Sequence, residues 1–195
     1  MPTQAERLAH TRRLLLDATI RCIAEQGYRA TTTRRVASSA GVSLGALAHH
    51  FPSRLELVAA ALDDASRAGT EALRADVAGT AGDTDALLDA LWRFFCGELF
   101  TVWVKGWLAA AEDEGLYARM VPIEARVNRA LADVLLGLAP PDLGPEAFRP
   151  RLAVALHAMR GLALGLAVEP RASGSGGDPW PATRAELSAL IRRRP

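Results

Sequence analysis

Apolar residues recur every three or four positions along almost the whole chain, which is the spacing of one face of an α-helix. Leu16, Ile20 and Ile23 form one such stripe, and the stripe ends at Gly27. Residues that favour strands alternate with polar residues over only a few positions, so strands are not expected. The sequence therefore predicts an all-α protein.

Glycine and proline residues divide the chain into about nine segments of helical length. The dividing positions are Gly27, Gly41, Pro52, 79–82, Gly115, 140–141 and 169–181. The expected helices cover 7–26, 33–40, 44–50, 53–78, 84–100, 102–113, 116–138, 145–168 and 181–193. We expect the glycine- and serine-rich stretch 172–177 to be an exposed loop.

The charged residues are distributed unevenly along the 195 residues. The whole chain carries 23 basic and 22 acidic side chains, yet residues 1–55 hold eight arginines against three acidic residues, a net charge of +5. Residues 56–195 carry a net charge of −4. A basic end on a mildly acidic body favours contact with a polyanion, although a solvated charged surface gives the same asymmetry.

Several classes of protein are disfavoured by what the sequence lacks. The stretch richest in apolar residues, 151–168, is interrupted by His157 and Arg160, and residues 1–13 lack the apolar core of a secretory signal. Cys22 and Cys96 are too few for a disulfide framework or a four-cysteine zinc site. The motifs HExxH, CxxC and the P-loop are absent. We therefore expect a cytoplasmic protein that is not an enzyme and uses no cofactor, metal or membrane.

The most informative segment is 30–54, which reads ATTTRRVASSAGVSLGALAHHFPSR. Thr32 or Thr33 can cap a first short helix, which Gly41 would end. Ser43 can then cap a second short helix. Two short helices joined by a turn that contains glycine form a helix-turn-helix.

This segment resembles the DNA-binding half of TetR/AcrR-type transcriptional regulators, over about residues 10–58. The pattern of that family runs roughly T-[TV]-R-[DE]-I-A-x-x-A-G-V-S-x-G-x-[LI]-Y-x-[HY]-F-x-[SN]-K. The matching residues are Thr32, Thr33, Arg34, Val36, Ala37, Ala40, Gly41, Val42, Ser43, Gly45, Leu47, His50, Phe51 and Ser53. Three residues depart from it: Arg35 replaces an acid, Ala48 a tyrosine that usually contacts DNA, and Arg54 a lysine.

The resemblance implies two domains. A three-helix helix-turn-helix DNA-binding domain would cover 1–55, with its motif at about 32–51, and a helical ligand-binding and dimerisation domain would cover 56–195. It implies a repressor that binds palindromic operator DNA as a homodimer, through helices 145–168 and 181–193, and is released by an unknown small molecule. A ligand-independent or activating regulator remains open, and so does a nucleoid-type DNA-binding protein, which the acidic body disfavours.

The candidate DNA contacts follow from a short recognition helix lying in the major groove. The residues expected at base edges are Ser43, Leu44, Gly45, Ala46 and His49. The residues expected at backbone phosphates are Thr32, Thr33, Arg34, His50 and Arg54. Thr32 could serve only as a helix cap, and Arg34 could simply lie on a solvated helix face. His50 could instead pack on Phe51. We expect Arg54→Ala to weaken binding to all sequences and to reduce the salt slope by about one.

Aromatic residues concentrate in two adjacent predicted helices, where they can line an apolar pocket. The candidate ligand-binding residues are Trp92, Phe95, Glu98, Trp103, Trp107, Asn128, His157 and Arg160. Glu98 would favour a cationic ligand and Arg160 an anionic one, so the chemistry of the ligand stays open. The aromatic residues could equally be part of the core. The polar residues could form pairs within the protein or face water.

Overall fold

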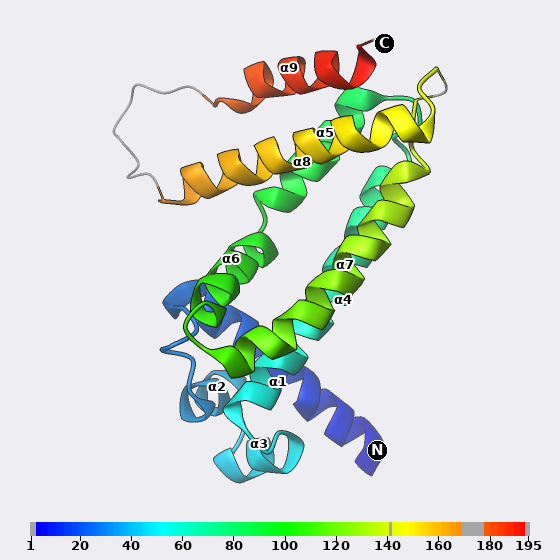
Figure 1. The fold of residues 1–195 in the computed structure, drawn as a ribbon. Helices are drawn as coiled ribbons and strands as arrows, with labels where there is room; N and C mark the ends of the chain where they lie inside the picture. The colour runs from blue at the N-terminus through cyan, green and yellow to red at the C-terminus, as the bar shows by residue number, and fades with distance from the viewer. Residues whose placement is uncertain (1–2, 141, 169–177, 194–195) are drawn as a thin grey trace. The chain divides into compact units, whose positions relative to one another are not determined.

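The computed structural model describes residues 3–140, 142–168 and 178–193, and these residues form nine helices and no strand (Figure 1). The helices are α1 (Gln4–Gln26), α2 (Thr33–Ala40), α3 (Leu44–His50), α4 (Arg54–Val77), α5 (Thr84–Phe95), α6 (Glu98–Ala110), α7 (Glu114–Leu136), α8 (Pro145–Val168) and α9 (Trp180–Arg192). The predicted all-α class is confirmed. The loop predicted over 172–177 lies outside the described residues. Among the described residues, no helix combines the length and apolar character that a membrane span requires.

Six of the nine described helices have at least one end that differs from the sequence prediction, and the structure shows the cause of two of these differences. A single helix was expected over 84–100, but α5 ends at Phe95 and α6 begins at Glu98. A Cβ atom on Gly97 would lie 3.2 Å from the carbonyl oxygen of Phe94, so the chain turns at a residue that has none. The other difference is that α1 starts at Gln4 rather than residue 7, because Thr3 caps it.

The first of two compact units contains residues 1–69 and 98–127. One buried cluster joins α1, α2, α3 and the start of α4; its largest members are Leu15, Leu16, Val36, Leu47, Phe51 and Leu57. A second cluster joins α1, α4, α6 and α7; its members include Ile23, Tyr28, Val58, Leu62, Leu116 and Met120. The short helices α2 and α3 are therefore held on a core that longer helices build.

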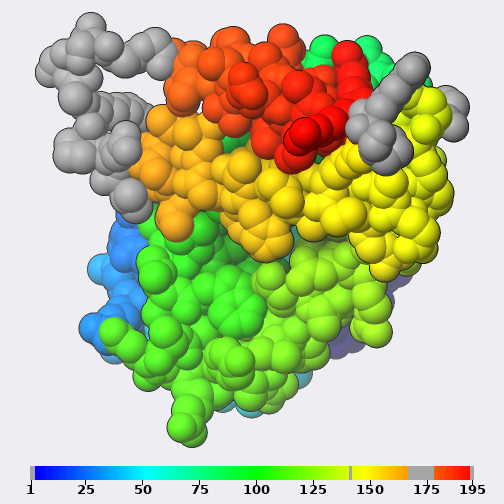
Figure 2. All heavy atoms as spheres, turned by 45° about the horizontal axis from the view of Figure 1, so that its top comes forward, coloured from blue at the N-terminus to red at the C-terminus, as the bar shows by residue number. Residues whose placement is uncertain are grey.

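The second compact unit contains residues 70–97 and 128–195. The ring of Trp180 at the start of α9 stacks on that of Trp92 in α5, with centroids 4.7 Å apart and planes 7° from parallel. The Trp180 indole N–H also donates to a carboxylate oxygen of Asp89 at 2.7 Å. These contacts anchor α9 to α5. Figures 1 and 2 show α8 and α9 side by side on this unit.

Candidate nucleic-acid interface

The turn between α2 and α3 is built by local hydrogen bonds. The Thr32 hydroxyl accepts from the backbone N–H of Arg35 at 3.3 Å and caps α2. Gly41 ends α2 with φ +68°, a left-handed conformation that glycine adopts without a Cβ clash. The Ser43 hydroxyl then accepts from the backbone N–H of Ala46 at 3.1 Å and caps α3. The structure thus contains the helix-turn-helix that the sequence predicts.

The two faces of α3 differ sharply in exposure. Leu47 is 2% exposed and Phe51 5%, and both pack in the first cluster. Leu44, by contrast, is 47% exposed although it is apolar. Among the other residues expected at base edges, Ser43, Gly45 and His49 are exposed and Ala46 is half-buried. The packing of α3 therefore leaves its candidate base-contacting residues at the surface.

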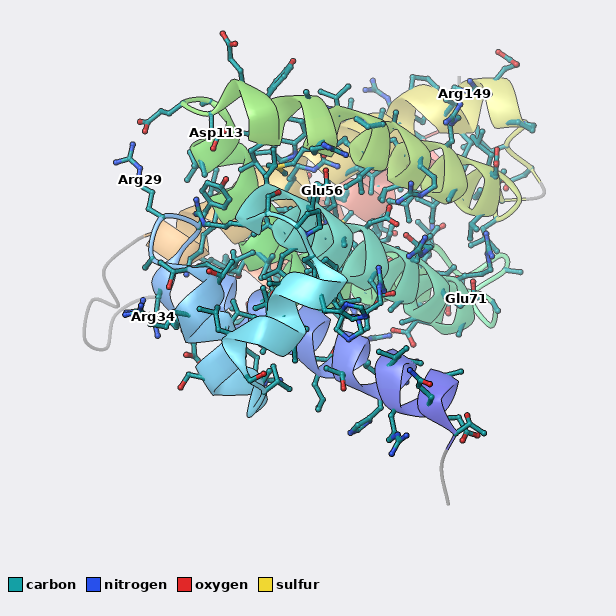
Figure 3. All side chains as sticks on the ribbon, turned by 90° about the horizontal axis from the view of Figure 1, so that it is seen from below. Arg29, Arg34, Glu56, Glu71, Asp113 and Arg149 are labelled. Atoms are coloured by element: carbon teal, nitrogen blue, oxygen red, sulfur yellow. The ribbon has the colours of Figure 1, made fainter. Side chains whose placement is uncertain are left out.

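An open hollow lies beside the N-terminal end of α2. Its lining residues are Gln26, Thr32, Arg34, Arg35, Ser38 and Ser39. Arg34 is exposed, and Figure 3 shows it pointing away from the helices. Among the described residues, no acidic side chain forms an ion pair with it. The guanidinium of Arg35 is differently placed, because it donates to the carbonyl oxygen of Ala30 at 2.8 Å.

The hollow also contains hydroxyl groups that the sequence interpretation did not single out. Ser38 lies four residues after Arg34, so both occupy the same face of α2. Helical spacing from Arg34 would have found it. Of the other predicted phosphate contacts, Thr32 is exposed and Thr33 is half-buried.

His50 lies between two other rings at the end of α3. Its ring centroid is 5.7 Å from that of His49 and 6.3 Å from that of Phe51. Burial lowers the pKa of His50, and the neighbouring charges of His49 and Arg12 lower it further. The uncharged form of this ring is therefore favoured in the DNA-free protein.

Arg54, the first residue of α4, is engaged within the first unit. Its guanidinium lies over the ring of Tyr28, 4.0 Å from the centroid. Its Nε–H donates to the carbonyl oxygen of Thr31 at 2.6 Å, and an Nη2–H donates to the carbonyl oxygen of Tyr28. These contacts tie α4 to the α1–α2 loop (residues 27–32). The phosphate contact assigned to Arg54 remains a prediction, to which the structure adds this second role.

The same loop is held from the other side by the end of α6 and the start of α7. The Tyr28 hydroxyl donates to a carboxylate oxygen of Asp113 at 3.0 Å, and burial followed by this bond raises the pKa of Tyr28. The other oxygen of Asp113 accepts from the backbone N–H of Leu116 at 2.9 Å. That bond first, and the Tyr28 hydroxyl second, lower the pKa of Asp113. Lys105 of α6 donates to the carbonyl oxygen of Ala24 near the end of α1.

The predicted ligand-binding residues fall in both units. Glu98, Trp103 and Trp107 belong to the first, and Trp92, Phe95, Asn128, His157 and Arg160 belong to the second. In the first unit, the Trp107 indole N–H donates to a carboxylate oxygen of Glu124 at 2.6 Å. Trp103 packs against the second cluster and Glu98 is exposed. Two of these three residues therefore have contacts inside the unit.

In the second unit the structure brings one predicted pair together. The guanidinium carbon of Arg160 lies 5.8 Å from the ring centroid of Phe95. His157 and Asn128 are exposed, and the Nδ1 atom of His157 lies 2.6 Å from the carbonyl oxygen of Ala153. No group of three or more His, Cys, Asp or Glu side chains in the described part of the chain is placed to hold a metal ion.

Comparison of the sequence with known proteins points to one family. Residues 15–61 match the family model described as bacterial regulatory proteins, tetR family. The HTH-type transcriptional regulator CymR of Pseudomonas putida is 31% identical over 166 residues, which cover 83% of this chain and 82% of CymR. The HTH-type transcriptional repressor Rv1474c of Mycobacterium tuberculosis is 40% identical over 91 residues, which cover 46% of this chain and 49% of the repressor.

Solved structures share the fold. A member of the TetR family from Streptomyces coelicolor A3 superposes with a TM-score of 0.67 at 23% identity, over 94% of this chain and 99% of the other. The multidrug binding protein EbrR, complexed with imidazole, superposes with a TM-score of 0.65 at 21% identity, over 94% and 96% of the two chains. The relatives named here are transcriptional regulators rather than enzymes.

Proposed function

Since this chain belongs to the TetR family of bacterial regulatory proteins, we propose that it is a repressor that binds a palindromic operator as a homodimer and is released by a small molecule. In this proposal residues 1–55 read DNA, and residues 56–195 form the dimer and bind the effector. The observation that carries the proposal is the division of α3 into a buried face and an exposed face.

The exposed face of α3 suits close approach to base pairs. Gly45 has no side chain, and a Cβ atom there would meet only the Ser43 hydroxyl oxygen, at 4.0 Å. Leu44 offers an apolar contact to thymine methyl groups, and His49 supplies the hydrogen-bonding group. With so few polar groups at the base edges, sequence-dependent DNA shape contributes to specificity. Arg34 and the hydroxyl groups beside it contact the DNA backbone, and these contacts position α3 on the duplex.

The homodimer is supported by the exposed surfaces of α8 and α9. Val154 is 54% exposed and Leu164 40%, and the exposed Gly161 lies on the same face of α8. The exposed residues of α9 include Ala182, Ala185 and Ala189, which share one face at intervals of three and four. Small and apolar side chains allow two helices to approach closely, so we assign these faces to the partner subunit.

The effector is supported by chemistry within the second unit and by one structural neighbour. Arg160 lies over Phe95, which places a cation and an aromatic ring together. EbrR, which shares the fold, is described as a multidrug binding protein. An effector releases the operator only by binding the DNA-free conformation more tightly than the DNA-bound one.

Selection of bound duplexes from random DNA tests the proposal. We expect enrichment of a palindrome whose half-sites lie about 34–36 Å apart or a multiple of that distance. Gly45→Glu adds a negative charge to the exposed face of α3 without crowding the core, and it should abolish selection. Gly144→Glu is the matched control, because a Cβ atom there meets nothing within 4 Å and the residue lies outside α3. Recovery of no enriched sequence from the wild-type protein would refute sequence-specific binding.

The dimer and the effector need separate measurements. Light scattering should give twice the chain mass at micromolar concentration, and a monomer would defeat the dimer proposal. A thermal-shift screen of small amphipathic compounds should find at least one that raises the melting temperature and also lowers affinity for the selected palindrome. If no compound in the screen raises the melting temperature of the protein, the proposal of a small-molecule effector is disfavoured.

A further inference from the structure

The N-terminal part of α1 extends beyond the core of the first unit. The buried residues of this helix begin at Leu15, whereas every residue from 3 to 10 is exposed. About two turns of helix are therefore formed without burying an apolar face. Isolated helices of this length are marginal in water, so a helix of this kind needs another source of stability.

A capping box supplies part of that stability. The Thr3 hydroxyl accepts from the backbone N–H of Glu6 at 3.2 Å, and the Glu6 carboxylate accepts from the backbone N–H of Thr3 at 2.6 Å. These bonds lower the pKa of Glu6, so its carboxylate stays ionised and bound to the cap. The carboxylate of Glu6 is thus bound at the N-terminal cap of α1.

The rest of this segment is basic. Arg7, His10, Arg12 and Arg13 fall within seven consecutive positions. Within the described part of the chain, no acidic side chain forms an ion pair with any of the three arginines. The exposed turns of α1 therefore present a surface of net positive charge.

This surface lies beside the recognition helix. The guanidinium carbon of Arg12 is 5.5 Å from the ring centroid of Phe51, the residue that ends α3. Figure 1 shows the N-terminal half of α1 and α3 at the same end of the first unit, and Figure 3 shows both on the face turned toward the viewer. A duplex that lies against α3 would continue past the start of α1.

We propose that the exposed basic turns of α1, residues 4–13, bind backbone phosphates of duplex DNA that flank the base pairs read by α3. This inference rests on the proposed function and extends it to a second contact on the same duplex. Ten helical residues span about 15 Å, which equals roughly four base-pair steps along the duplex axis. The contact adds affinity and salt dependence without adding sequence preference.

Two duplexes that share the selected palindrome provide the test. One ends at the palindrome, and the other continues for about six base pairs on each side. The slope of log K against log salt is about −0.9 per phosphate contact, so each contact strengthens binding about eightfold when the salt concentration falls tenfold, from about 1 M to about 0.1 M. We expect the wild-type protein to bind the longer duplex at least tenfold more tightly, with a steeper salt slope.

Arg7→Gln/Arg13→Gln removes two charges and leaves the Arg12–Phe51 contact intact. This variant should lose most of the preference for the longer duplex, and its affinity for the shorter duplex should match that of the wild type. Arg93→Gln/Arg129→Gln is the matched control, since both residues are exposed, lie outside α1 and carry the same charge. The control should keep the preference for the longer duplex.

The outcomes separate this inference from the proposed function. If the wild-type protein selects a palindrome but binds both duplexes alike, the α1 contact is refuted and the operator proposal stands. If the α1 variant weakens binding to both duplexes by the same factor as the control variant, the effect is one of net charge and the contact is again refuted. Failure to select any palindrome refutes the proposed function itself.

Discussion

Replacing Arg54 with alanine separates two roles for one side chain. Its guanidinium makes one hydrogen bond of 2.6 Å to Thr31, a second to the carbonyl oxygen of Tyr28, and a contact of 4.0 Å with the Tyr28 ring. All three are made in the absence of DNA. If they matter, Arg54→Ala destabilises the free protein, whatever the side chain also does in a DNA complex.

The size of the loss follows from these contacts. Each hydrogen bond contributes about 1 kcal/mol net, because the part-buried carbonyl groups regain some water when the donor is removed. The cation–π contact adds about 0.5–1 kcal/mol at a site of this exposure. The sum is about 2–3 kcal/mol. In a chain of this length each kcal/mol shifts the melting temperature by about 2–4 °C, so Arg54→Ala should melt roughly 5–10 °C lower.

The assay is thermal unfolding of the DNA-free protein beside a salt titration of operator binding. Arg34→Ala is the matched control, since Arg34 is an exposed arginine at the predicted phosphate surface and forms no ion pair among the described residues. We expect Arg34→Ala to keep the wild-type melting temperature and to flatten the salt slope by about one per protomer. An Arg54→Ala variant that melts like the wild type would refute the structural role. If Arg54→Ala reduces the salt slope by about one, that result would establish the phosphate contact of Arg54.

Three further changes test other parts of the structure. Hydrogen bonds, first from a backbone N–H of α7, lower the pKa of Asp113 below 3.8, so its contribution to stability is full above that pH and is lost as the pH falls through the lowered value. Asp113→Asn should therefore flatten the loss of stability below about pH 4, measured by urea unfolding. Gly41→Ala should cost about 1–2 kcal/mol because of its φ of +68°, whereas Gly45→Ala within α3 should cost nothing. Leu164→Glu should give monomers by light scattering, and Val121→Glu, equally exposed on α7, should not.

The helix-turn-helix could be predicted because its geometry depends on neighbouring residues. Thr32 and Ser43 each cap a helix by accepting an N–H three residues later, and Gly41 takes the left-handed conformation that ends α2. Such bonds are made within one turn of the chain, so the sequence alone contains the information. The exposed face of α3 follows in the same way from the position of Leu47.

The remaining differences depend on contacts that spacing does not reveal. The break between α5 and α6 was missed because apolar residues continue the helical period across Gly97. The partners of Arg54 lie 23 and 26 residues away, and the Glu124 that accepts from Trp107 lies 17 residues away. A periodic pattern identifies the face on which such a residue sits. It does not show which distant backbone or side-chain group that residue reaches.

The α1–α2 loop is where stability and DNA binding become coupled. Arg54 of α4 donates a hydrogen bond to a backbone carbonyl group of this loop. Asp113, in the turn after α6, accepts from the Tyr28 hydroxyl of the loop, and Lys105 of α6 donates to the end of α1 just before it. The loop leads directly into Thr32, which caps α2 and lies at the predicted phosphate surface. A displacement of α6 therefore alters the approach to α2 without reaching α3, whereas a displacement of α4 also reaches α3 through Leu57 in the first cluster. Substitutions in this loop should change folding and affinity together, whereas those on the exposed face of α3 should change affinity alone.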